Sequence, residues 1–140
     1  MLACTIILAV KAHFILYVAD QQRSTKFYSS VLLTPPTLSV PGMTEFLIGE
    51  STILGLMPED AIVRLLGDAI SHPSLARDIP RSEVYLVVKD PADFHSRAIA
   101  AGARELSALA LRDWDHTVAY SQDPDGHILA FASSAEIIIP

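Results

Sequence analysis

Two stretches of the chain carry the same pattern of polar and apolar positions. Residues 13–20 (HFILYVAD) and 83–90 (EVYLVVKD) are apolar runs of strand length that open on a polar residue and end in Asp. About a dozen residues with helical spacing follow each run. The two copies begin half of the 140-residue chain apart. The pattern therefore predicts two related halves with a cleft between matching strands.

In each half, the pattern of residues predicts a strand, a helix and three further strands. In the first half we expect them at about 11–18, 21–32, 37–40, 44–48 and 52–57. In the second half we expect them at about 83–88, 91–101, 104–108, 116–121 and 127–132. Asp20 and Asp90 precede the helices and have side chains that cap them.

The predicted fold class is α+β, with two βαβββ modules forming an open barrel-like cup and the helices outside. We expect a single domain over 1–140, with module one at about 11–58 and module two at about 82–133. The linker, 59–81, contains several prolines and predicts one or two helical turns. Residues 1–10 form an extra apolar segment that is too short to span a bilayer.

Alternation along the strands assigns side chains to faces, because successive residues of a strand point to opposite sides. Phe14, Leu16 and Val18 form an apolar face that we expect to pack on the helix. The opposite face of the two matching strands carries the polar residues and the tyrosines, and we expect it to face the cleft: His13, Ile15, Tyr17, Glu83, Tyr85 and Val87.

The composition of the chain limits the kinds of partner it can bind. The formal charge of −6 argues against nucleic acid or an anionic membrane, since both require basic patches. The only cysteine, Cys4, cannot form an internal disulfide, and the expected compartment is the cytoplasm. The apolar segments 1–10 and 136–140 are candidate strands that would favour a homodimer if exposed.

The motifs of the chain resemble those of the vicinal oxygen chelate superfamily, the group of glyoxalase I, bleomycin resistance proteins and extradiol dioxygenases. The resemblance rests on H-x-x-L-x-V-x-D from His13, on R-S-x-x-F-Y-x-x-V-L from Arg23, and on D-P-D-G-H at 123–127. It covers about residues 11–133. It implies paired βαβββ modules that form an open cup, usually in a dimer, and, in the enzymes, a divalent metal such as Ni, Zn, Mn or Fe.

The resemblance also implies four metal-ligand positions, on the first and last strands of each module. His13 and Glu83 stand at the two first-strand positions, whereas Gly55 and Ala130 stand at the last-strand positions and have no ligating side chain. Leu33 replaces the glycine that follows V-L in the family. Two ligands are fewer than the three that a catalytic metal needs, so no cofactor is the first expectation.

Three roles for His13 and Glu83 stay open. They could form a hydrogen-bonded or ionic pair that joins the modules, ligate a metal, or act without a metal, with Glu83 as a general base aided by His13. His72, His116 or His127 could supply a further ligand, although alternation places His127 on the wrong face.

Other candidate ligand contacts are aromatic, apolar or basic. Tyr17, Tyr85, Phe46 and Met57 could form an apolar wall, with a place in the core as the alternative. Arg112 could bind a carboxylate or phosphate, and Trp114 could stack on a planar molecule, with Tyr120 nearby. The alternative for this second group is a solvated loop that closes the cup.

The favoured function is metal-independent binding of a small organic molecule in the cup. The alternative is a metal-dependent lyase, isomerase or dioxygenase of the glyoxalase type that uses His13 and Glu83. A third alternative is a structural dimer whose cup is filled by its own side chains.

Overall fold

The computed structural model describes residues 10–134. The expected strands at 1–10 and 136–140 lie outside this range, apart from Val10. The elements of the first half are β1 (Ala12–Val18), α1 (Gln21–Leu32), β2 (Leu38–Val40), β3 (Met43–Leu47) and β4 (Thr52–Pro58). The linker holds α2 (Glu59–Leu66) and the short 3-10 helices η1 (Gly67–Ala69) and η2 (Pro73–Ala76). The second half has β5 (Glu83–Val87), α3 (Pro91–Ala100), β6 (Arg104–Leu111), β7 (His116–Gln122) and β8 (Ile128–Ser134).

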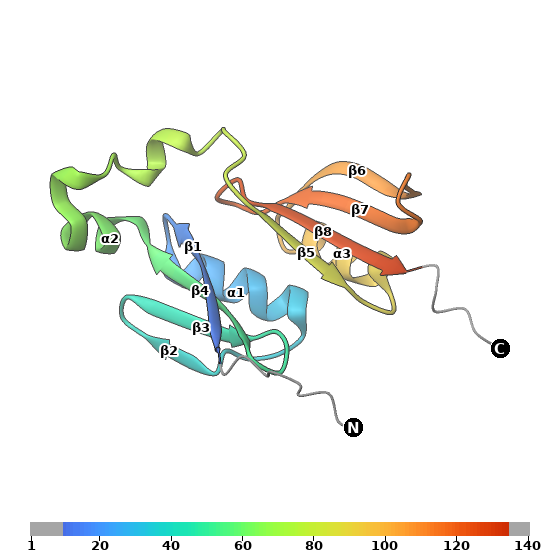
Figure 1. Ribbon diagram of the computed structural model, residues 1–140, viewed down its shortest axis with the longest axis horizontal. Coiled ribbons are helices and arrows are strands. Elements are labelled where there is room, and N and C mark those ends of the chain that lie inside the picture. Colours follow the sequence, from blue (N-terminus) through green and yellow to red (C-terminus); the bar gives the residue numbers. More distant parts are fainter. Residues whose placement is uncertain (1–9, 135–140) are drawn as a thin grey trace, which may run out of the picture.

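The strands form two four-stranded mixed sheets, in the orders β1-β4-β3-β2 and β5-β8-β7-β6 (Figure 1). In both sheets the first and last strands of the module pair in parallel and the other neighbours are antiparallel. The repeated order confirms the predicted α+β fold of two βαβββ modules. The sheets do not close into a barrel, so β1 and β5 are both edge strands.

Helices α1 and α3 cover the same side of the two sheets and share one core. Asp20 and Asp90 cap them as predicted, accepting hydrogen bonds from the amides of Arg23 and Asp93. Leu16 and Val18 pack beneath α1 in a core that continues to Phe131 of the second sheet. The other face of each sheet is covered by neither α1 nor α3, and we call it the open face.

The expected packing of β1 against the helix holds for Leu16 and Val18 but not for Phe14. Phe14 lies on the helix side, as alternation requires, but it is 62% exposed. It stands near the start of an edge strand, where α1 does not cover it. Within residues 10–134, no helix has the length and apolar character needed to cross a membrane.

Helix α1 ends in a strained conformation. Leu33 has φ 53° and ψ 40°, the left-handed region, and its amide donates to the carbonyl of Ser29. Helices that end in this conformation usually have glycine there, because a Cβ is disfavoured in it. The glycine that Leu33 replaces in the family pattern therefore has a physical purpose, although the fold forms without it.

Candidate functional site

The open face of module one carries a mostly apolar surface with one ionic pair. His13 on β1 and Glu45 on β3 lie on either side of β4, and His13 Nδ1 is 3.6 Å from Glu45 Oε2. Both side chains are partly exposed. His13 therefore pairs within its own module, and no ion pair joins it to Glu83 in the described part of the chain.

Gly55 lies between these two strands, at one of the expected ligand positions. A Cβ at Gly55 would lie 3.1 Å from Cγ1 of Ile15 and 3.3 Å from Sδ of Met43. Such distances are tighter than ordinary packing, so a longer side chain here would require both neighbours to move. Apolar side chains thus occupy the space that a ligating carboxylate would need.

The open face of module two is built around Ala130, the other expected ligand position. Tyr85 of β5 and Tyr120 of β7 are its two cross-strand neighbours, and both pack against a fully buried floor that Ala130 forms with Val118 and Ala132. A small residue in the central strand is therefore flanked by two tyrosine rings. Nothing at Ala130 can bind a metal.

The hydroxyl of Tyr85 is the centre of a hydrogen-bonded cluster. Nε1 of Trp114 donates to it over 2.9 Å, and Nδ1 of His116 lies 2.6 Å from it. In the tautomer of His116 that carries its proton on Nε2, the hydroxyl donates to Nδ1. One lone pair of the Tyr85 oxygen then stays available to a bound molecule. Trp114 is half exposed, so the cluster is open to solvent.

Glu83 lies at the start of β5 and is exposed. Its carboxylate has no hydrogen bond or ion pair with another residue between Val10 and Ser134. The pKa of the Tyr120 hydroxyl is raised, mainly because the hydroxyl is removed from water. The negative charge of the Glu83 carboxylate raises this pKa further. Glu83 is thus near Tyr120, as His13 is near Glu45 at the equivalent place in module one.

Arg112 is engaged with its own sheet. Its Nη2 donates to Ser107 Oγ at 2.9 Å, to the carbonyl of Ala108 at 3.0 Å and to that of Val118 at 2.8 Å. The guanidinium carbon lies 5.2 Å from the ring centre of Tyr120. These contacts join β6 to β7, so Arg112 serves as a support for Tyr120 in this conformation.

The other expected contacts divide between the two faces. Tyr17 and Met57 are neighbours across β1 and β4 and are partly exposed on the open face. Phe46 is fully buried, 6.5 Å from the ring of Tyr28 on α1. It therefore belongs to the core beneath the helix and not to the open face, because β3 exposes Glu45 there instead.

The metal expected of the family's enzymes does not fit this arrangement. His13 and Glu83 have separate surroundings, and Gly55 and Ala130 offer no donor atom. Among residues 10–134, no three His, Cys, Asp or Glu side chains come together in a group that could hold a metal ion. His72 and His127 do not complete a site either, since His72 contacts Asp60 and His127 is buried.

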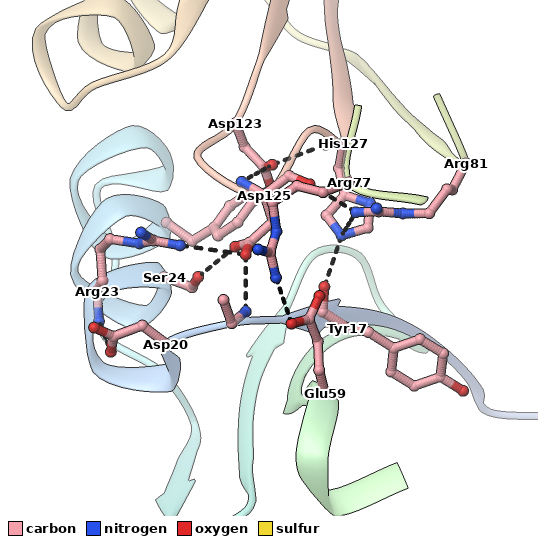
Figure 2. Close-up of polar contacts among 12 residues, drawn as sticks. Tyr17, Asp20, Arg23, Ser24, Glu59, Arg77, Arg81, Asp123, Asp125 and His127 are labelled. Carbon is pink, nitrogen blue, oxygen red and sulfur yellow. Dashed lines mark hydrogen bonds and ion pairs between the residues drawn. The ribbon is translucent and has the colours of Figure 1, made fainter. Parts of the chain in front are cut away.

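Sequence reasoning missed a second polar centre, which joins the two modules (Figure 2). The carboxylate of Asp125, in the β7–β8 turn, is fully buried. It accepts hydrogen bonds from the Ala19 amide at 2.8 Å, Ser24 Oγ at 3.0 Å and Arg23 Nη2 at 3.2 Å. The turn of module two thereby closes on the junction of β1 and α1.

Asp123 and His127 complete this centre. The Asp123 carboxylate accepts from the Tyr28 hydroxyl at 2.5 Å and from the amides of Asp125 and His127. Burial is the main cause that raises the pKa of Asp123, and burial also raises the pKa of Tyr28 well above its usual value. His127 Nε2 lies 2.9 Å from the carbonyl oxygen of Tyr17. In the sequence, D-P-D-G-H is one of the motifs that carry the family resemblance, and nothing local in it indicates these distant partners.

Gly126 shows how closely the linker packs on this turn. Its φ is +93°, and a Cβ there would lie 2.3 Å from the carbonyl oxygen of Arg77. Arg77 in turn binds the buried carboxylate of Glu59 at 2.6 Å. The linker therefore packs against the same polar centre that joins the two modules. We conclude that this centre stabilises the fold.

This chain has two βαβββ modules, with helices on one side of the sheets and an open face on the other. This arrangement is that of the cup-shaped α+β proteins. The family model of the Glyoxalase/Bleomycin resistance protein/Dioxygenase superfamily matches residues 11–131. The chain belongs to this superfamily, as its motifs suggested. A comparison with the curated proteins gave no match.

Solved structures share the fold. A glyoxalase-related enzyme from Fulvimarina pelagi aligns with a TM-score of 0.75 and 21% identity, over 91% of this chain and 89% of its own. A glyoxalase/bleomycin resistance protein/dioxygenase from Nocardioides aligns with a TM-score of 0.69 and 21% identity, over 98% of this chain and 91% of its own. A family enzyme from Burkholderia phytofirmans gives 0.67 and 18%, over 86% and 95%. At these identities the likeness concerns the fold alone.

Proposed function

We propose that the protein binds a small organic molecule on the open face of module two, without a metal ion. The observation that carries the proposal is the Tyr85 hydroxyl, which Trp114 and His116 hold in place at a solvent-accessible position. A pre-positioned hydrogen-bonding group beside exposed aromatic surface is typical of small-molecule sites. Gly55 and Ala130, where the enzymes have ligands, support a metal-independent role.

The ligand class follows from the side chains present. Trp114 offers a half-exposed ring for stacking on a planar group. The Tyr85 oxygen can accept one further hydrogen bond, so a donor such as a hydroxyl or amide N–H suits it. We therefore assign a molecule with a planar or aromatic part and a hydrogen-bond donor. Chemistry at Glu83 is not required for this binding.

The test is a thermal-shift screen of aromatic hydroxyl and amide compounds on chelator-treated protein, followed by titration of each compound that stabilises it. Tyr85→Phe should weaken binding about tenfold, the value of one well-formed hydrogen bond. Tyr17→Phe is the matched control, since Tyr17 is also on the open face, and its Kd should stay within about twofold. Equal Kd values in the wild type and Tyr85→Phe would contradict the proposal.

We also propose a homodimer. Its support is the open face of module one, where apolar side chains are exposed on three of the four strands: Ile15 on β1, Leu38 and Val40 on β2, and Leu47 on β3. An exposed apolar surface commonly marks a protein interface. Light scattering should give twice the chain mass for the wild type, and Val40→Glu should shift it to one chain mass. A wild-type protein of one chain mass at high concentration would contradict the dimer.

A further inference from the structure

A hollow of about 410 Å³, whose lining side chains are mostly apolar, lies at the free edge of β5. Its walls come from four parts of the chain: the end of α1 (Leu32 and Thr34), the end of β3 and the turn after it (Leu47 and Ile48), β5 and the residue after it (Tyr85, Leu86, Val87 and Val88), and α3 (Phe94). Because alternate residues of a strand point to opposite faces, Tyr85 and Val87 belong to the open face and Leu86 and Val88 to the helix layer. The hollow therefore connects the open face with the apolar layer beneath it.

The equivalent place in the other module is closed. There, the β7–β8 turn fastens itself to the end of β1 through Asp125, which accepts from the Ala19 amide, and through His127, which contacts the Tyr17 carbonyl. The β3–β4 turn brings Ile48 to the matching position beside β5. No hydrogen bond joins that turn to β5 in the described residues. The two halves thus differ in what fills the space beside the edge strand.

Resting on the function proposed above, we infer that the ligand is amphipathic and that an apolar tail of it occupies this hollow. Tyr85 links the two parts of the site, since its hydroxyl belongs to the cluster with Trp114 and His116 while its side of β5 lines the hollow. A planar head beside Trp114 and Tyr85 would leave its substituent facing the hollow. The volume is at the lower end of the usual range for small-molecule sites, about 300–1,000 Å³.

Another depression on the described surface does not suit such a tail. It lies between α1 and β2–β3 and is lined mainly by polar side chains, among them Gln21, Arg23 and Lys26. The amide of Gln21 already bridges it, donating to the Val40 carbonyl and to Thr44 Oγ1 and accepting from the Gly42 amide. It also lies apart from Tyr85, so one ligand would not reach both.

The experiment uses alkyl esters of 4-hydroxybenzoic acid (methyl, butyl and hexyl) as probes on the full-length, chelator-treated protein. Trp114 is the only tryptophan, so its fluorescence reports on the head of the probe. The Kd should fall about three- to fourfold for each methylene added from methyl to butyl, because each is transferred from water to an apolar wall. Equal Kd values for the three esters would overturn the inference.

A blocking variant locates the tail. Thr34→Phe places a ring at the exposed rim of the hollow, on the side formed by the end of α1 and not by β5, and should leave the methyl ester's Kd unchanged while removing the gain with chain length. Leu75→Phe, on the exposed surface of η2, is the matched control and should keep that gain. A gain that persists in Thr34→Phe would overturn the inference.

The two proposals fail in different ways. If the methyl ester binds and Tyr85→Phe weakens it, but length has no effect, the proposed head site stands and the tail site does not. If no ester binds at millimolar concentration, both the head site for phenolic compounds and the tail site are contradicted.

Discussion

Replacing Asp125 by Ala should destabilise the protein by about 3 kcal/mol, because its buried carboxylate joins the two modules. The buried Ser24 hydroxyl would lose its hydrogen-bond acceptor, which costs about 1–3 kcal/mol. The Ala19 amide would also lose its acceptor, at a cost of about 1 kcal/mol. Arg23 is 47% exposed, so its lost ion pair adds less than about 1 kcal/mol. Relief of carboxylate desolvation offsets part of this sum.

Urea unfolding followed by far-UV circular dichroism measures the change. With a slope of about 2 kcal/mol per molar urea, the midpoint should fall by about 1.5 M. A protein of ordinary stability, about 5–15 kcal/mol, still folds after such a loss. Asp78→Ala is the matched control, since Asp78 is exposed and has no hydrogen bond or ion pair within the described range. If Asp125→Ala cost less than about 1 kcal/mol, as a surface substitution does, the view that this turn holds the modules together would be refuted.

Two further predictions concern Asp123 and Leu33. Because burial raises the pKa of Asp123, the folded state keeps its proton where the unfolded chain has released it. The stability from this group is therefore full below the ordinary carboxyl pKa, about 4, and is lost as pH rises through the folded pKa. Urea unfolding from pH 3.5 to 7 should show the wild type losing stability relative to Asp123→Asn, whose amide oxygen can still accept the turn's two N–H bonds. If the difference in unfolding free energy between the wild type and Asp123→Asn stayed constant from pH 3.5 to 7, the raised pKa of Asp123 would be contradicted. Leu33→Gly should raise the free energy of unfolding by about 0.5–1 kcal/mol, since glycine avoids the left-handed strain and Leu33 is 69% exposed. An unchanged or lower thermal midpoint would count against that reasoning.

The elements and most faces could be predicted because they depend on local pattern. The helix expected at 21–32 is α1, with the same ends, and Asp20 caps it. Alternation in β1 correctly buried Leu16 and Val18. The linker is more helical than the one or two turns expected, since it holds α2, η1 and η2.

The candidate site was harder to predict because it depends on register between distant strands. A shift of one residue moves every side chain of a strand to the other face, and β3 is short. Phe46 was a candidate for the cleft wall, with the core as the alternative. The register of β3 with β4 places it in the core under α1 and leaves Glu45 on the open face beside His13. The contacts of Tyr85 with Trp114 and His116 likewise join separate elements of module two.

The central claim is that the open face binds its ligand without a metal ion. The most direct test is calorimetric titration of a stabilising aromatic compound, with chelator and then with Ni²⁺, Zn²⁺, Mn²⁺ or Fe²⁺ added to metal-stripped protein. Metal-independent binding predicts the same Kd in every condition, a weaker Kd in Tyr85→Phe, and no stoichiometric micromolar binding of the ions themselves. Binding that requires an ion and disappears in both His13→Ala and Glu83→Ala would contradict it.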